Sequence, residues 1–175
     1  TNLSSTVVYT VTPRYGTDGT CSGPTFQVSV QVNPRASITT QPLGASACQN
    51  GTTPALSVAY TGGTGTPTYQ WYSSATNSNT GGTAITTNGT AASYTPPTTT
   101  IGTTYYYVEV TQDISGCKVI SNTASVQIVP QPTVSTQPEA LRSICVGGSV
   151  SAYSVAYTGG TGNATYQWYS NTTNS

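Results

Sequence analysis

The sequence predicts an all-β protein in which one small β-sandwich of about 97 residues is repeated in tandem. The strongest indication is a near copy: residues 57–78 and 154–175 are identical at 18 of 22 positions and lie 97 residues apart. Composition points the same way, because Thr, Val and Tyr favour strands and the chain has little of the Lys and Glu that exposed helices use. Gly and Pro interrupt the chain at short intervals, as they do between short strands.

The same period relates other residues. It recurs in three pairs at spacings of 96 or 97 residues: Cys48 with Cys145, Trp71 with Trp168, and Cys21 with Cys117. From this phase we expect three parts: the C-terminal strands of a truncated repeat at 1–36, a complete repeat at 37–132, and the N-terminal strands of a truncated repeat at 133–175. We therefore expect the chain to be an excerpt from a longer polypeptide.

The first strands of the complete repeat follow from alternation and from the turn residues between them. Ser37–Thr40 is expected to be the first strand, at an edge, and it is ended by Pro42. Ala55–Tyr60 alternates apolar and polar residues. The glycine-rich run 62–67 is expected to be a loop, and Thr68–Ser73 is expected to be a strand with Trp71 facing the core.

The later strands are predicted in the same way. A glycine turn leads into a short strand within 79–85, and two prolines end another strand at Ala92–Thr95. Thr104–Thr111 is the longest alternating strand, residues 112–116 form a hairpin loop, and Lys118–Val129 is the last strand.

About seven short strands with one buried tryptophan on the third are typical of an immunoglobulin-like sandwich. Trp168, the counterpart of Trp71, is expected to be a core residue of the next repeat. The expected core of the complete repeat consists of the inward-facing apolar residues Leu56, Val58, Trp71, Ile85, Tyr94, Tyr106, Val108, Val110, Val126 and Ile128.

Three motifs occur in a distinctive order: YQWY at 69–72, YYYVEV at 105–110 and a GC hairpin at 116–117. Together they resemble the immunoglobulin-like repeats of large surface proteins from Bacteroidota, such as the gliding-motility adhesin and related giant adhesins. The resemblance covers residues 37–175 and, more loosely, 1–36. It implies export by the type IX secretion system and display outside the outer membrane. Because such repeats occur in many proteins, the resemblance identifies a class of module and not a task.

Charge excludes several kinds of partner. The chain has four Lys or Arg and four Asp or Glu among 175 residues, so its net charge is zero. It offers no basic patch for nucleic acid or for anionic lipid. It also has no apolar run long enough for direct membrane insertion.

The residue types of a catalytic or metal site are missing as well. The chain has no His to act as a general base, and its cysteines lack the spacing of a zinc site. Its four carboxylates, Asp18, Glu109, Asp113 and Glu139, form no facing pair in the predicted fold. We therefore expect no enzyme, no cofactor and no metal.

The four cysteines suit an oxidising compartment. A disulfide between Cys48 and Cys117 within the complete repeat is the first choice, with Cys21 and Cys145 bonded to partners outside this window. In an ordinary immunoglobulin topology, however, the two residues would lie at opposite ends of the sandwich, and Cys48 would reach the hairpin cysteine of the next repeat more easily. Free thiols are the third alternative.

Tyrosine is in excess, with 13 residues. Tyr72, Tyr105, Tyr107 and Tyr169 leave the core face of their strands and are the candidates for an adhesive surface that stacks on sugars or polymers. Alternatively, they cover the second sheet face and form cross-strand pairs.

We therefore expect a structural or adhesive segment of a long extracellular filament that mediates attachment or surface motility. Its expected partners are the adjacent repeats of the same polypeptide and a polysaccharide or abiotic surface. One alternative is a spacer or carbohydrate-binding stretch of a secreted multidomain enzyme. Another is a self-assembling fibre subunit in which incomplete sandwiches exchange strands.

Overall fold

The computed structural model describes residues 4–17, 19 and 21–173, and within these residues it is all-β with no helix, as predicted. The strands are β1 (Ser5–Val11), β2 (Arg14–Tyr15), β3 (Cys21–Ser22), β4 (Phe26–Val32), β5 (Ser37–Thr40), β6 (Ala45–Cys48), β7 (Leu56–Ser57), β8 (Ala59–Thr61), β9 (Pro67–Ser74), β10 (Thr83–Ala84), β11 (Ser93–Tyr94), β12 (Gly102–Gln112), β13 (Lys118–Ile120), β14 (Ala124–Val129), β15 (Thr133–Thr136) and β16 (Ala156–Thr158).

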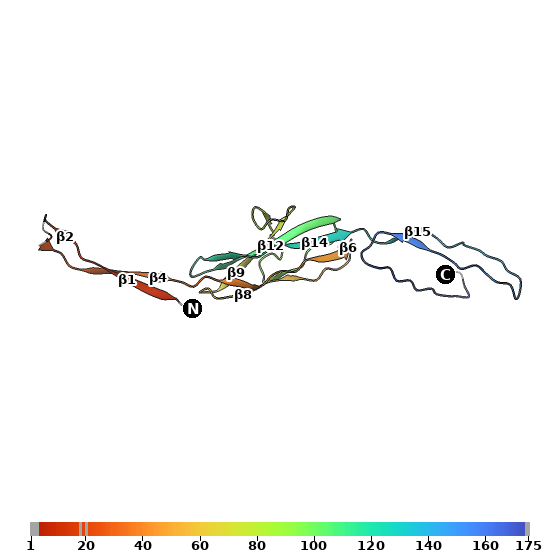
Figure 1. The fold of residues 1–175 in the computed structure, drawn as a ribbon, viewed down its shortest axis with the longest axis horizontal. Helices are drawn as coiled ribbons and strands as arrows, with labels where there is room; N and C mark the ends of the chain where they lie inside the picture. The colour runs from red at the N-terminus through yellow and green to blue at the C-terminus, as the bar shows by residue number, and fades with distance from the viewer. Residues whose placement is uncertain (1–3, 18, 20, 174–175) are drawn as a thin grey trace.

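The three parts of the chain lie end to end in an elongated molecule (Figure 1). An N-terminal ribbon of β1 and β4 carries the small β2–β3 pair at its far tip. The central part, β5 to β14, holds the main sheet, and β15 and β16 pair beyond it.

The central part is built around β12, its longest strand with 11 residues. The strand order of the main sheet is β10-β9-β12-β14-β6, and β13 pairs with the second half of β12. All of these pairings are antiparallel except that of β6, which runs parallel to β14 from Ala45 opposite Val126 to Cys48 opposite Val129.

Two short antiparallel pairs, β5–β8 and β7–β11, contribute the side chains that face this sheet. Together with the main sheet they give a sandwich-like arrangement around one hydrophobic core. The buried core residues are Ala47, Leu56, Val58, Trp71, Tyr106, Val108, Val110, Ala124, Val126 and Ile128. Of the predicted core, Ile85 and Tyr94 are partly buried and pack against this cluster, whereas Ala47 and Ala124 were not predicted.

Two predicted strands are each divided in two. The strand predicted at Ala55–Tyr60 changes partner at Val58, whose N–H donates to the carbonyl of Ala92 (3.1 Å). As a result β7 pairs with β11, and β8 pairs with β5.

The strand predicted at Lys118–Val129 is interrupted at Ser121, which is fully buried. Its Oγ accepts a hydrogen bond from Val108 N (3.0 Å) and donates one to Asn122 O (2.8 Å). Between β13 and β14, the Ser121 hydroxyl therefore takes the place of a backbone carbonyl as the acceptor for Val108 N.

The two outer parts repeat pairings of the central part. Ser5 opposite Val32 in β1–β4 corresponds to Gly102 opposite Ile128 in β12–β14. The pair β15–β16 repeats that of β5–β8, including the register shift, which falls between Val134 and Thr136 in the former and between Ile38 and Thr40 in the latter.

Trp168 corrects a prediction, because it is 53% exposed whereas Trp71 is fully buried. The reason is that Trp71 lies on β9, between β10 and β12. The described residues around Trp168 pair with no such strands.

Candidate functional site

The predicted adhesive surface consisted of Tyr72, Tyr105, Tyr107 and Tyr169. The structure removes Tyr107 from this set, because its side chain is buried. Its side chain is 4% exposed and stacks on Tyr72, with ring centroids 5.1 Å apart and an interplanar angle of 9°. Its Oη accepts a hydrogen bond from Gly82 N (3.0 Å). Tyr107 and Tyr72 are thus a cross-strand pair covered by the turn before β10, which is the alternative role considered for these residues.

Tyr105 lies elsewhere on this face and is partly exposed. It lines a shallow groove of about 690 Å³ whose other walls carry hydroxyl and amide groups. These come from β6, β12, β14 and the loop after β9: Ser46, Asn77, Thr103, Ser125 and Gln127. One aromatic ring beside neutral donors and acceptors can stack on a polyhydroxylated ligand and hydrogen bond to it.

Tyr169 is 89% exposed in the C-terminal part of the chain. It lies outside this groove. The structure therefore does not bring the four predicted tyrosines together into one surface.

The buried tyrosines have a structural role. Burial raises the pKa of Tyr94 and of Tyr106 above 10.0, since ionisation would place a charge in the core. Trp71 lies next to Tyr94, with 6.1 Å between ring centroids, and its indole N–H donates to Ala91 O (2.9 Å). At the sheet surface the Glu109 carboxylate accepts a hydrogen bond from Lys118 Nζ (2.7 Å), which raises the pKa of Lys118.

The predicted disulfide between Cys48 and Cys117 is not formed. None of the four cysteines is bonded to another in this structure. Cys48 pairs with Val129 at one end of the sheet, and the Cys117 carbonyl accepts a hydrogen bond from Gln112, at the other end of β12 (3.0 Å). Because β12 spans 11 residues, about 30 Å separates the two ends, far beyond the ~7 Å that a disulfide allows between Cα atoms.

The hairpin that carries Cys117 is attached to the glycine-rich loop before β9. Asp113 Oδ1 accepts a hydrogen bond from Thr66 N (2.7 Å), and Asp113 N donates to Thr66 O (3.2 Å). Gly65 has a φ of +100°, and a Cβ there would clash with the Asp113 carboxylate. Asp18, which by sequence occupies the hairpin loop equivalent to that of Asp113 in the preceding repeat, lies outside the described residues.

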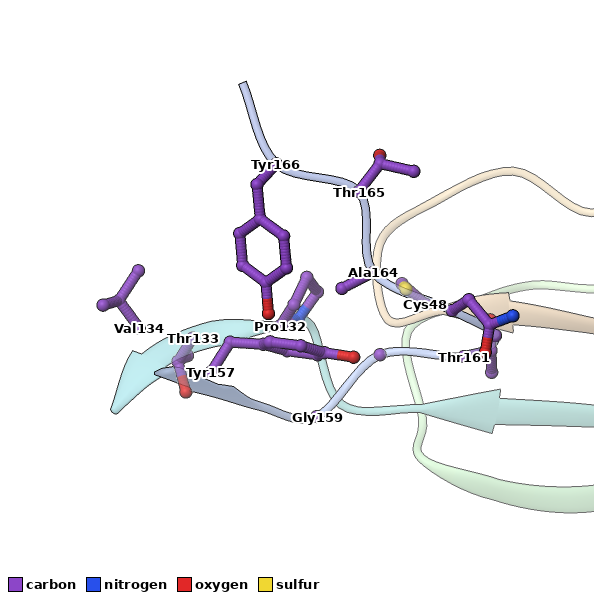
Figure 2. A pocket seen from close by; sticks show the side chains of 13 residues that line it. Cys48, Pro132, Thr133, Val134, Tyr157, Gly159, Thr161, Ala164, Thr165 and Tyr166 are labelled. Carbon is purple, nitrogen blue, oxygen red and sulfur yellow. The ribbon is translucent and has the colours of Figure 1, made fainter. Parts of the chain in front are cut away.

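Cys48 lies at the opposite end, where the central part meets the C-terminal part. Figure 2 shows it beside a cavity of about 420 Å³ that is also lined by Pro132 and by residues 159–166 of the next glycine-rich loop.

Hydrogen bonds hold this junction in place. The Gln49 carbonyl accepts a bond from Gln131 Nε2 (2.9 Å), and the Pro130 carbonyl accepts one from Gly160 N (2.8 Å). The linker is therefore tied both to the end of the central part and to the loop that follows it.

The sequence of the central part matches a known family model, described as a domain of unknown function (DUF8696), over residues 38–130. The chain belongs to this family. The matched residues of this DUF8696 chain hold the groove beside Tyr105 and the thiols of Cys48 and Cys117. No curated protein matches the chain in sequence.

Two further observations concern other kinds of site. Across residues 4–17, 19 and 21–173, no three His, Cys, Asp or Glu side chains cluster so that they could hold a metal ion. The same residues contain no helix of the length and hydropathy needed to cross a membrane.

The groove was missed from the sequence because β6 was missed. Ala45–Cys48 is short and does not alternate strongly, and its partner β14 is about 80 residues further along the chain. One feature of the sequence pointed to the groove. Alternation placed the Tyr105 side chain on the face of β12 opposite the core residue Tyr106, and the groove lies on that face.

Proposed function

We propose that this chain is a structural and adhesive segment of a long extracellular surface protein, in which immunoglobulin-like modules stand in series. The near copy at 57–78 and 154–175 supports repetition, and the end-to-end arrangement of the three parts supports a filament (Figure 1). On the resemblance of the YQWY and YYYVEV strands, the protein belongs on the cell surface of a bacterium with type IX secretion.

The strand order supports an immunoglobulin-like module. The order β10-β9-β12-β14 follows that of strands C′, C, F and G of a variable-type domain, and the buried Trp71 lies on the strand that corresponds to C. The β7–β11 and β8–β5 pairs correspond to the opposite sheet.

The observation that carries the structural role is the parallel pairing of β6 with β14. The chain enters the central part ahead of β6 and leaves it after β14, toward the next part. Tension along the filament therefore pulls these two strands in opposite directions along their length. Four register pairs, from Ala45–Val126 to Cys48–Val129, carry this load together, so no hydrogen bond can be opened alone.

The adhesive role is proposed for the groove beside Tyr105. Its neutral hydroxyl and amide lining suits a polysaccharide, and a net charge of zero provides no attraction to a strongly charged polymer. One shallow groove on each module would bind weakly, and repetition along the filament would supply avidity.

Two experiments test the proposal. An antibody against residues 37–132 should label intact cells and detect, on a denaturing and reducing gel, a polypeptide many times longer than 175 residues. A short polypeptide that also carries a catalytic domain would instead support the spacer function.

For adhesion, the purified chain is applied to immobilised neutral polysaccharides. Tyr105→Ala should reduce retention by about tenfold, as expected for loss of one ring–sugar stacking contact. The control Tyr169→Ala changes an exposed ring outside the groove and should not. Equal losses in both variants would contradict the assignment of the groove.

A further inference from the structure

The groove beside Tyr105 crosses the two strands that carry tension in the proposed filament, β6 and β14 (Figure 1). Strand β14 contributes Ser125 and Gln127 to the floor of the groove, and β6 contributes Ser46. The register of this parallel pair places Ser46 opposite Gln127, and both residues are exposed. Because side chains alternate between the two faces of a strand, both point away from the core and stand next to each other. The groove therefore bridges the load-bearing contact.

A third strand extends this floor. In the β12–β14 register, Thr103 lies opposite Gln127 and Tyr105 lies opposite Ser125. One row of side chains, from Thr103 through Gln127 to Ser46, thus runs across β12, β14 and β6. Neighbouring strands are about 4.8 Å apart, so the row spans roughly 10 Å. A ligand that lies along the row contacts the hydroxyl or amide groups of all three strands.

Strand β6 is held to the module mainly by hydrogen bonds. Of its four residues only Ala47 is buried, whereas three of the six residues of β14 are buried. Along the chain β6 follows β5, which is joined to β8 by three register pairs, so a pull reaches β6 once this short pair opens. Because little apolar surface holds β6, a ligand that joins it to β14 adds a large share of its attachment.

Gly44, the residue before β6, keeps the strand close to β14. A Cβ at this position would lie 2.6 Å from the Ser125 carbonyl oxygen, which is too close for any side chain. The chain therefore enters β6 in direct contact with β14, and the floor of the groove stays open beside Ser125. A side chain at residue 44 would both lift the start of β6 and fill the groove.

We propose that ligand and tension act on the same contact. A neutral polysaccharide bound along the row holds β6 to β14 and so strengthens the module against tension. A pull that separates β6 from β14 divides the groove and releases the ligand. The inference rests on the function proposed for the groove and adds the regulation of that site by force.

Thermodynamic linkage sets the size of this coupling. The ligand binds best while Ser46 stands beside Gln127, so bound ligand lowers the population of modules with a detached β6. The reduction reaches at most about a hundredfold when the free ligand is at 100 times Kd. The coupling is reciprocal, so detachment of β6 weakens binding by the same factor that saturating ligand gains against detachment. A detached module keeps part of its affinity, because Thr103 and Tyr105 remain in place on β12.

The test pulls on single 175-residue chains, held by tags at both ends, at constant force in reducing buffer. Opening of the central part is recognised by its length, because about 90 residues extend to roughly 300 Å. The probes are two neutral oligosaccharides, cellohexaose and maltohexaose, whose Kd is first measured by titration calorimetry. An oligosaccharide that binds should, at about 100 times its Kd, lengthen the lifetime of the central part at least about tenfold.

A matched pair of variants tests whether the coupling passes through β6. Ser46→Ala and Thr103→Ala each remove one exposed hydroxyl from the same row, the first on β6 and the second on β12. With ligand at about 100 times each variant's own Kd, Thr103→Ala should keep the increase in lifetime and Ser46→Ala should lose most of it. Lifetimes without ligand, measured for each variant, separate this effect from any change in the strength of the empty module.

The outcomes distinguish this inference from the function on which it rests. Binding of neither oligosaccharide would contradict the proposed adhesive function and this inference together. Binding with an unchanged lifetime, or an equal increase in the two alanine variants, would overturn the inference alone and leave the groove as a binding site.

Discussion

Trp71 and Trp168 lie in almost identical sequences and in very different surroundings. Both follow the segment SVAYTGGTG, and both occupy the third position of YQWY. Trp71 is fully buried, whereas Trp168 is 53% exposed. Burial of these tryptophans is therefore decided by strands distant in sequence, above all β12, and not by the local sequence of the tryptophan strand.

The largest effect on stability is expected when each tryptophan is replaced in turn. Trp71→Ala should lower the free energy of unfolding by about 3–5 kcal/mol, because it empties the centre of the core and leaves Ala91 O without its donor. Trp168→Ala should change it by less than about 0.5 kcal/mol. Urea unfolding followed by circular dichroism, in reducing buffer at low protein concentration, measures both. Similar losses in the two variants would contradict the comparison.

The two glycine-rich loops provide a second pair. Gly65 and Gly162 both have positive φ, but only Gly65 has the cysteine hairpin packed against it. Gly65→Ala should cost about 2–4 kcal/mol, from left-handed strain together with the clash at Asp113. Gly162→Ala meets no atom and should have little effect on unfolding of the central part. The measurement is the urea midpoint of each variant, and a midpoint equal to that of the unchanged chain for Gly65→Ala would refute this role of the hairpin.

A third pair tests the buried serine between β13 and β14. Ser121→Ala leaves Val108 N without an acceptor inside the core and should cost about 1–3 kcal/mol. Thr25, at the corresponding position of the N-terminal ribbon, is exposed, so Thr25→Ala should be nearly neutral. Amide hydrogen exchange at Val108 should accelerate in the Ser121 variant alone.

The smallest expected effect is the pH dependence of the central part. Burial raises the pKa of Tyr94 and Tyr106 above 10.0 in the folded chain, so the unfolded chain loses these protons first. This contribution is therefore fully present below about pH 10 and is lost as pH rises through the raised values. Lys118, with its pKa raised by Glu109, changes stability in the same direction. Urea midpoints should fall between about pH 9 and pH 11, and less so in a Tyr94→Phe, Tyr106→Phe variant.

Much of the central part could be predicted from the sequence, because period-two alternation is a local property. Trp71, Val108 and Val110 were assigned to the core by alternation alone, and all three are fully buried. The failures concern long-range relations. Tyr107 alternates as a surface residue but is covered by the turn at Gly82, and Trp168 lacks the strands that bury its counterpart.

The candidate site was less predictable for the same reason. The groove exists because β6 joins β14, a parallel pairing that nothing in the four residues of β6 indicates. The cysteine positions were clear from the sequence, but only the strand order shows that Cys48 and Cys117 lie at opposite ends of the central part.

Neighbouring strands, and not local sequence, decide how these repeated segments are buried. Acrylamide quenching of the two single-tryptophan variants, Trp71→Phe and Trp168→Phe, measures the exposure of each tryptophan separately. In dilute reducing solution, the remaining Trp71 should be shielded from acrylamide and the remaining Trp168 should be readily quenched. Equal quenching of the two tryptophans in dilute solution would contradict the account.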